Sequence, residues 1–441
     1  MKRLLSLLLC AVLALFCATT AQAAGVSITL TASEYALHYA FDAGAQDPFV
    51  ILEYTTPAEK GWMMLYSEDG HFEGDVSLAY SGAGGKTSVA LTSARTTGSI
   101  GKASTTLPKA ADYQKPTGKS NAKVTDFVLT ETPEGFHYAF NAAGTDYMLL
   151  YWRSKEQTVT QPVYPDENGH YEGDVISDLT FARTQFTVQV KSGSGSMKKE
   201  ATVRKGYQAP EAPQRQEGRL SGVTVCIDAG HQENGRFVNE PIGPGLSGST
   251  SGKGGMAQGT KTNRRESIVC LEIGMLLRDE LLRQGANVIM TREDQTTFHT
   301  NIERCEIAEA GGAQIMLRLH CNNSSNHSKR GIQVYGPLNS DYAKAVADAD
   351  TYREMGQKLL DAMKTRVGMT LANSTGMVRL NDNYVGNNWA KMMCFLVEMG
   401  YLSNPAEEYL LVTPVYQQWL AEGMADGVYE IAVARGWVQA Q

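Results

Sequence analysis

Beyond residue 23 the sequence has no hydrophobic run of the roughly 20 residues that a membrane-spanning helix needs. It also has no block of lysine and arginine, and its formal net charge at pH 7 is -7. A basic block is typical of nucleic-acid binding, so its absence argues against that class of partner. We therefore expect a mildly acidic, soluble globular protein with no membrane span in the mature chain and no nucleic-acid partner.

The sequence also lacks a regular pattern of cysteines. Of its 7 cysteines, two lie in the first 17 residues, which leaves five in the rest of the chain: Cys226, Cys270, Cys305, Cys321 and Cys394. An odd number with irregular spacing is a poor framework for disulfides in an exported protein. We expect these five to be mostly free, buried thiols.

The N-terminal segment resembles a secretory signal peptide. Lys2 and Arg3 precede an apolar run over residues 4–16, and Ala21-Gln22-Ala23 forms a small-x-small cleavage site. A lipoprotein would need a small residue before the acylated cysteine, whereas Cys17 follows Phe16. We therefore expect residues 1–23 to be removed and the mature protein to be exported.

Two motifs return in the first half of the chain at one fixed distance. LHYAF at 37–41 returns as FHYAF at 136–140, and DGHFEGDV at 69–76 returns as NGHYEGDV at 168–175. Both pairs are offset by 99 positions (38 to 137 and 71 to 170). An ungapped duplication explains this spacing most simply.

Each copy has the pattern of an all-β module. Asp-Gly at 69–70 and Asn-Gly at 168–169 are hairpin-turn dipeptides, and apolar and polar residues alternate after them. We predict two β-sandwich-like repeats, at 24–110 and 122–206. The acidic GHFEGD stretch is interpreted as the charged solvent face of a hairpin rather than a calcium site. Targeting, spacing and packing on the next domain all stay open as roles of the repeats.

A proline-rich polar linker at 207–218 separates these repeats from residues 219–441, where the pattern of predicted secondary structure changes. Strand-like runs alternate there with helical stretches, which predicts an α/β domain with a mostly parallel sheet flanked by helices. The expected strands are 223–227, 287–291, 315–319, 332–335 and 395–397, and the expected helices are 266–283, 302–310, 342–366 and 415–434.

Two histidines follow predicted strands of this domain. His231 comes after VCIDAG, and His320 ends the run IMLRLH. The carboxyl ends of parallel strands lie at one edge of a sheet, so these side chains are expected to converge. For a single histidine, a hydrogen-bonded role in a turn is the more ordinary explanation.

Glu266 is the third candidate. Alone, it is more simply explained as part of a capping box with Asn263 at the start of a helix. Two imidazoles and one carboxylate together, however, are a ligand set of catalytic zinc sites, which leave the fourth position to water. The combination therefore favours a metal site.

Glu398 ends the apolar run CFLVE, where burial would raise its pKa and suit it to proton transfer near neutral pH. The residues that follow have a structural explanation. Asn404 is expected to cap a helix, with Pro405 in its first turn and Glu407 completing a capping box. Only Glu398 is assigned to the site.

In these motifs the region from about 220 to 437 resembles the zinc-dependent N-acetylmuramoyl-L-alanine amidases, which cleave peptidoglycan between muramic acid and the stem peptide. The motifs occur in the family's order: IDAGH, NRRES, NVIMTRED, NIERCEIA, LRLHCN and LVEMGYLSNP. The resemblance implies one Zn²⁺ held by His231, Glu266 and His320, with Glu398 as the catalytic acid and base. It also implies a peptidoglycan substrate and an extracellular, wall-associated or periplasmic location.

The sequence departs from the family pattern at three positions: Ala229, Gln232 and Cys321. Adjacent residues of an extended strand point to opposite sides, so Cys321 is expected to pack rather than bind the metal beside His320. Asp228 is expected to orient the His231 turn. The sequence leaves open whether Arg292 and Arg304 do more than form salt bridges.

A glycine- and serine-rich insertion, 239–260, lies between His231 and Glu266. We expect it to form a wall of the substrate cleft, because both of its ends approach the proposed metal.

Two other functions stay open for the whole chain: a zinc peptidase acting within the stem peptide, and a non-catalytic wall-binding protein.

Overall fold

The computed structural model describes residues 19–22, 25–132, 135–154, 157–176, 185–204, 209–232, 238–250, 255–367 and 377–440. The chain divides into two compact units, residues 1–206 and 207–441. Most of the expected signal peptide lies outside the described residues. Its residues Thr19–Gln22 form strand β1, which pairs with β2.

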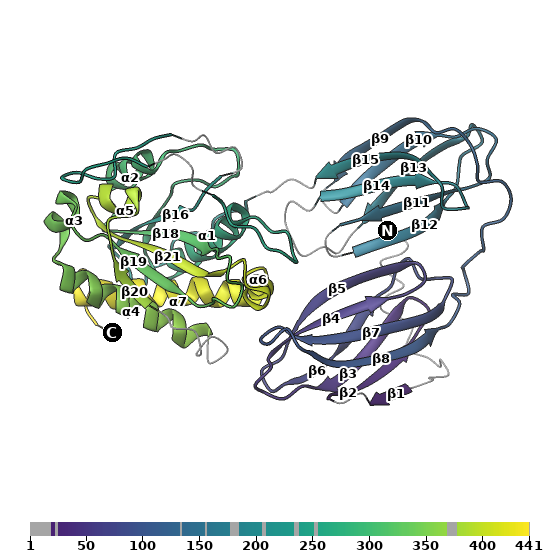
Figure 1. Ribbon diagram of the computed structural model, residues 1–441, viewed down its shortest axis with the longest axis horizontal. Helices are drawn as coiled ribbons and strands as arrows, with labels where there is room; N and C mark the ends of the chain where they lie inside the picture. The colour runs from purple at the N-terminus through teal and green to yellow at the C-terminus, as the bar shows by residue number, and fades with distance from the viewer. Residues whose placement is uncertain are drawn as a thin grey trace. The chain divides into compact units, whose positions relative to one another are not determined.

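The first half of the N-terminal unit consists of two packed sheets (Figure 1). One contains β1, β2, β3 and β6, and the other contains β4, β5, β7 and β8. Alternate residues of β3 are buried, so Leu37, Tyr39 and Phe41 enter a core shared by both sheets. The bounds are β2 (Ser27–Ala32), β3 (Ala36–Asp42), β4 (Phe49–Thr55), β5 (Glu59–Tyr66), β6 (His71–Ser77), β7 (Gly85–Ser93) and β8 (Ser99–Leu107).

The second half contains the same succession of strands. Strands β10 and β13 begin 99 residues after β3 and β6 begin (36 to 135 and 71 to 170). Its core centres on Phe136, Phe140, Trp152 and Tyr171. The bounds are β9 (Thr125–Thr132), β10 (Gly135–Asn141), β11 (Met148–Arg153), β12 (Gln157–Val163), β13 (His170–Ile176), β14 (Gln185–Lys191) and β15 (Met197–Arg204).

One sheet is continuous through both halves. Strand β12 pairs antiparallel with β5, so eight strands run in the order β15-β14-β11-β12-β5-β4-β7-β8. The repeated motifs do not predict this junction. The acidic stretch after the first hairpin faces solvent, where Glu73 and Asp75 contact His38 at 3.3 and 3.1 Å.

A buried carboxyl group lies beside the junction. Glu59 is 3% exposed and accepts hydrogen bonds from the Tyr80 backbone N–H, the Ser81 hydroxyl and the Gln157 amide at 3.0, 2.9 and 3.1 Å. Burial raises the pKa of Glu59 above its usual value of 4.5, although these donors act in the opposite direction.

The C-terminal unit is an α/β domain with a six-stranded sheet in the order β17-β16-β18-β21-β19-β20. All its pairs are parallel except β19–β21, so the expected mostly parallel sheet is confirmed. The bounds are β16 (Thr224–Ala229), β17 (Asn287–Met290), β18 (Ile315–Asn322), β19 (Gln333–Gly336), β20 (Met377–Leu380) and β21 (Met393–Tyr401).

Helices cover both faces of this sheet (Figure 1). Helix α7 contacts both α1 and α4 on one face, and α5 contacts α2 and α3 on the other. The bounds are α1 (Glu266–Arg283), α2 (Asn301–Ala310), α3 (Asp341–Val346), α4 (Ala349–Val367), α5 (Val385–Trp389), α6 (Pro405–Leu411) and α7 (Pro414–Ala434). Among the described residues, no helix combines the length and apolar character needed to cross a bilayer.

Most predicted elements of this domain are confirmed, with one correction and two omissions. The helix expected at 342–366 is two helices, because the chain leaves the helical conformation at Ala347, where φ is -165°. Strand β20 and the short helix α5 are not predicted. The five cysteines described in this unit are free and buried, as expected.

The raised pKa of Glu59 predicts that the stability of the β5–β12 junction depends on pH. The folded protein retains a proton that the unfolded chain has released, so the unfolding free energy falls as pH rises above about 4.5. Each unit of raised pKa corresponds to about 1.4 kcal/mol. Hydrogen–deuterium exchange of β5 and β12, corrected for intrinsic rates, should show this loss in the wild type and a smaller one in Glu59→Gln. The exposed Glu167→Gln is the control, and an unchanged pH dependence in Glu59→Gln would contradict the assignment.

Candidate metal centre

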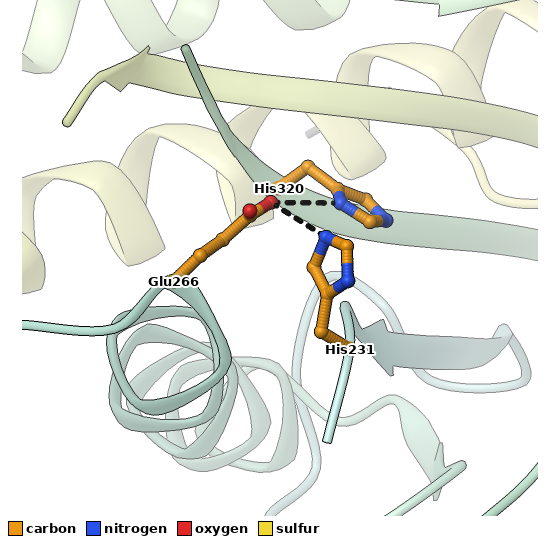
Figure 2. A group of neighbouring side chains, drawn as sticks. All are labelled: His231, Glu266 and His320. Carbon is orange, nitrogen blue, oxygen red and sulfur yellow. Dashed lines mark hydrogen bonds and ion pairs between the residues drawn. The ribbon is translucent and has the colours of Figure 1, made fainter. Parts of the chain in front are cut away.

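Three elements bring the expected site residues together (Figure 2). His231 follows β16, Glu266 is the first residue of α1, and His320 lies near the end of β18. Strands β16 and β18 are parallel neighbours, so both histidines reach the carboxyl edge of the sheet. The convergence expected from the sequence is therefore present.

The backbone beside His231 lies very close to the segment that carries His320. His231 has a φ of 58°, in the left-handed region that most side chains avoid. A Cβ atom added to the preceding Gly230 would lie 2.5 Å from the Leu319 carbonyl oxygen and 2.6 Å from the His320 ring. Only glycine lets the two histidine-bearing segments lie this close.

One carboxylate oxygen lies between the two imidazoles. Oε1 of Glu266 is 3.1 Å from Nε2 of His231 and 2.9 Å from Nδ1 of His320. Its other oxygen, Oε2, accepts a hydrogen bond from the Ala257 backbone N–H at 2.7 Å. One nitrogen of each ring and one carboxylate oxygen lie within 4.8 Å of one another, so these residues could hold a metal ion.

The electrostatics of this group favour a charged carboxylate and a neutral His320. Burial opposes ionisation of Glu266, but its contacts with the two histidines lower its pKa well below the usual value. Burial also lowers the pKa of His320, despite the hydrogen bond to Glu266. Neutral imidazoles and a carboxylate are the protonation states that bind metal.

Glu398 lies on β21 directly opposite His320 of β18. Burial, and then the negative charge of Glu266, raise the pKa of Glu398 to about 8. Its Oε2 atom is buried and has no hydrogen-bond partner among the described residues. A buried carboxyl oxygen without a partner costs free energy unless it serves a function or a bound group satisfies it.

The four residues open into one cleft of about 910 Å³. The described part of the insertion lines this cleft through Glu240, Ile242, Thr250 and Met256, as the sequence analysis expected for the insertion. Glu240 also holds the insertion against α2, because it accepts backbone hydrogen bonds from Asn301 and Ile302 at 3.2 and 2.8 Å.

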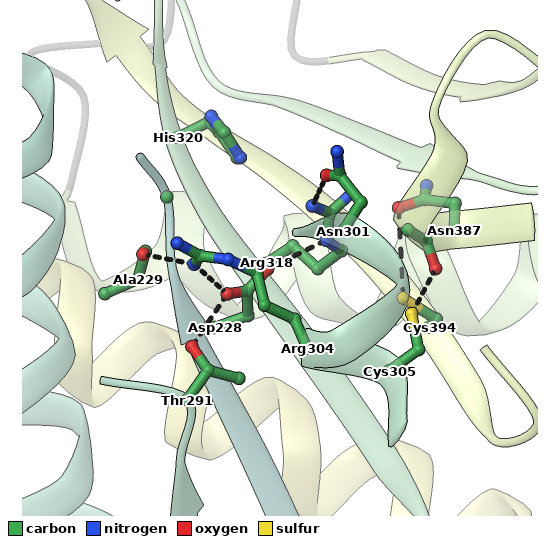
Figure 3. Close-up of polar contacts among 12 residues, drawn as sticks. Asp228, Ala229, Thr291, Asn301, Arg304, Cys305, Arg318, His320, Asn387 and Cys394 are labelled. Carbon is green, nitrogen blue, oxygen red and sulfur yellow. Dashed lines mark hydrogen bonds and ion pairs between the residues drawn. The ribbon is translucent and has the colours of Figure 1, made fainter. Parts of the chain in front are cut away.

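A buried ionic cluster supports the floor of the cleft (Figure 3). Asp228 is fully buried, pairs with Arg304 and Arg318, and accepts a hydrogen bond from Thr291 at 2.8 Å. Burial opposes its charge, but the two guanidinium groups lower the pKa of Asp228 far below the usual range. The sequence analysis missed Arg318, although its position two residues before His320 places it on the same face of β18.

Asp228 acts on His231 indirectly, through the arginine it holds. Arg304 donates to the carbonyl oxygens of Ala229 and His231 at 2.9 and 3.3 Å. Arg292 donates to the carbonyl oxygens of Ala229 and Gly230 at 2.7 and 2.8 Å. The two arginines therefore clamp the backbone that carries His231, and their role goes beyond a simple salt bridge.

Two capping assignments from the sequence need correction. Arg265 occupies the N-cap position of α1, and Asn263 lies outside the helix with a φ of 58°, so Asn263 and Glu266 form no capping box. Asn404 caps α6 as expected, but the Glu407 side chain accepts from the backbone N–H groups of Tyr401 and Gly331 instead of completing a box.

Residues 225–430 match the family model described as N-acetylmuramoyl-L-alanine amidase. The C-terminal domain belongs to this amidase family. The amidase domain contains all four residues of the candidate site, and the matched segment begins after the N-terminal unit ends.

Two curated relatives are similar to about half of the chain. The germination-specific N-acetylmuramoyl-L-alanine amidase of Bacillus subtilis is 26% identical over 231 residues, 49% of this chain and 83% of the relative. The probable cell wall amidase LytH of Staphylococcus aureus is 27% identical over 218 residues, 48% of this chain and 60% of LytH. This chain thus spans less than two thirds of the length of LytH.

Among solved structures, the N-acetylmuramoyl-L-alanine amidase from Clostridium difficile 630 is similar at 23% identity, with a TM-score of 0.38. That similarity covers 48% of this chain and 96% of the other.

The buried ionic cluster predicts that the domain's stability is sensitive to substitution of Asp228. Asp228→Asn should lower the free energy of unfolding of the amidase domain by about 3 kcal/mol, because two buried guanidinium groups lose their carboxylate. Denaturant unfolding of the full chain measures this change. The control is Asp350→Asn, which removes an exposed pair with Arg353 and should change stability by less than about 0.5 kcal/mol. Equal stabilities of the two variants would contradict the role of Asp228.

Proposed function

We propose that this protein is an exported peptidoglycan hydrolase that cleaves the amide bond between N-acetylmuramic acid and the L-alanine of the stem peptide. One observation carries the proposal: in a domain of the amidase family, two imidazoles and one carboxylate converge beside Glu398, whose buried Oε2 atom has no hydrogen-bond partner in the described part of the chain. The signal-like N-terminus supports export to the wall.

We infer that the bound metal is zinc. The donor set of His231, Glu266 and His320 fits a catalytic zinc site, which uses three protein ligands and leaves one position open. The protonation states of the ligands also fit. The pKa of Glu266 is lowered, which favours its carboxylate, and the pKa of His320 is lowered, which favours its neutral imidazole. When bound, zinc supplies a water of lowered pKa and polarises the carbonyl group that is attacked.

The chain itself supplies the proton transfers. In this mechanism the carboxylate form of Glu398 accepts a proton from the attacking water. Glu398 then returns that proton to the leaving nitrogen of L-alanine, so one residue acts first as base and then as acid. A positive charge bound at the three ligands would favour the carboxylate form of Glu398 in the resting enzyme.

The clamped turn and the cleft walls position these groups. Arg292 and Arg304 fix the backbone beside His231, which sets the direction of its imidazole. The insertion encloses one side of the cleft through Glu240 and Thr250 and limits access of bulk water to the reacting amide. We further propose that the N-terminal unit arose by duplication of one module, given that β10 and β13 begin 99 residues after β3 and β6 begin.

Analysis of the new chemical ends separates this proposal from its two rivals. Digestion of purified cell walls should release peptides with a free L-alanine amino group and leave muramic acid without peptide. A zinc peptidase would expose amino groups of other residues within the stem, and a wall-binding protein would release nothing. Either of those results would reject the proposed cleavage.

Glu398→Gln should bind zinc normally but lose activity, because glutamine cannot accept or return the proton. The expected fall in kcat is about 10²- to 10⁴-fold. Wall solubilisation and zinc content measure the two effects separately. The matched control is the exposed Glu306→Gln, which should keep full activity, and full activity of Glu398→Gln would remove its assigned role.

His320→Ala should lose both zinc and activity, because only two ligands remain. Metal content after dialysis against a weak chelator gives the direct measurement. The exposed His327→Ala serves as control and should keep both properties. Stoichiometric zinc in His320→Ala would exclude His320 as a ligand.

A further inference from the structure

The eight-stranded sheet has a polar concave face that is separate from the amidase cleft. This face encloses about 690 Å³ and lies over β12, β5, β4, β7 and β8, on the side opposite the core that contains Leu52 and Tyr54. We call it the lysine face, because Lys60, Lys86 and Lys102 line it.

Strand register arranges the side chains of this face in rows. One row crosses five strands through Thr158, Lys60, Thr55, Ser88 and Ser104. With strands about 4.8 Å apart, this row is about 19 Å long. The lysine face is therefore long enough for several linked groups of an extended ligand.

A second row adds an aromatic ring. Trp62 lies opposite Glu53, which lies opposite Ala90, which in turn lies opposite Lys102. The indole of Trp62 is half-buried and lines the concave face. It offers an apolar surface beside hydroxyl and ammonium groups.

The middle of this face offers side chains rather than backbone groups to a ligand. The backbone groups of β5, β4 and β7 are engaged with neighbours on both sides, so these three strands offer no edge for an added strand. The composition also differs from a protein interface, whose core is depleted in lysine, glutamate, serine and alanine. Hydroxyl groups beside one aromatic ring suit a sugar chain.

The charge of the face favours an anionic ligand. Lys60, Lys86 and Lys102 are exposed, and none forms an ion pair with a residue in the described part of the chain. Glu53 is the acidic residue among those that line the face. Three lysines against one glutamate stand out in a chain with a net charge of -7.

We propose that the lysine face binds a glycan strand that carries carboxylate groups. This inference rests on the proposed amidase activity, because hydrolysis of the lactyl amide by water leaves a carboxylate on muramic acid and an amino group on the released peptide. The product glycan thus acquires negative charges that its substrate lacks at the same positions. The N-terminal unit would retain the protein on strands that its amidase domain has already processed.

Charge density argues against a nucleic acid in the same place. Each strand of a duplex carries one phosphate per about 3.4 Å, which is five or six over a row of about 19 Å. Three lysines and a glutamate do not balance that number. Carboxylates borne only by the muramic acid residues of a glycan are fewer over the same length.

Binding is tested with the full mature chain carrying Glu398→Gln, so that hydrolysis does not change the ligand. The probes are peptide-free glycan strands prepared with an independent amidase, uncharged N-acetylglucosamine oligomers and a single-stranded oligonucleotide. Lys60→Gln, Lys86→Gln and Lys102→Gln are combined in one variant, and Trp62→Ala is a second. The matched control combines Lys115→Gln, Lys123→Gln and Lys199→Gln, which removes the same charge at exposed positions away from the face.

The peptide-free glycan should bind, and the lysine-face variant should weaken its binding by about tenfold, since each exposed charge contributes little on its own. Trp62→Ala should also weaken it, and the control should bind as the parent does. Equal binding of all variants, tighter binding of the oligonucleotide, or no preference for glycan over the uncharged oligomer would overturn the inference. If the wild-type protein bound the peptide-free glycan but did not hydrolyse cell walls, that result would reject the amidase proposal alone.

Discussion

The candidate site depends on one buried carboxylate, Asp228. It lies at the end of β16 and holds Arg304 from α2 and Arg318 from β18, so it connects three elements beneath the cleft. Arg304 in turn fixes the backbone of His231. A buried charge of this kind is tolerated only when its partners satisfy it, which gives this part of the domain a single arrangement.

Three carboxyl groups in the same small region differ in protonation because their neighbours differ. Asp228 is ionised by two guanidinium groups, and Glu266 is ionised by contact with two imidazoles. Burial raises the pKa of Glu398, and the charge of Glu266 raises it further. The domain thus separates residues that hold charge from one that can exchange a proton near neutral pH.

The sequence predicts the amidase domain well where its signals are local. Helix α1 has the expected bounds, and the placement of His231 and His320 follows from the strands that precede them. The sequence does not reveal Arg318, because an arginine within an apolar strand has no local motif and its partner is 90 positions away. The capping box predicted for Glu407 is wrong, because its side chain accepts from the backbone of Tyr401 and of Gly331, which is 76 positions away. The roles of the four site residues remain predictions.

The pairing of β5 with β12 has a consequence for how the N-terminal unit avoids self-association. Without that pairing, β5 and β12 would each end a sheet and present unsatisfied backbone groups, which are templates for pairing with another molecule. Each strand instead covers the other within the same chain. The two halves thus resemble a covalently linked dimer in which β5 and β12 occupy each other's edges.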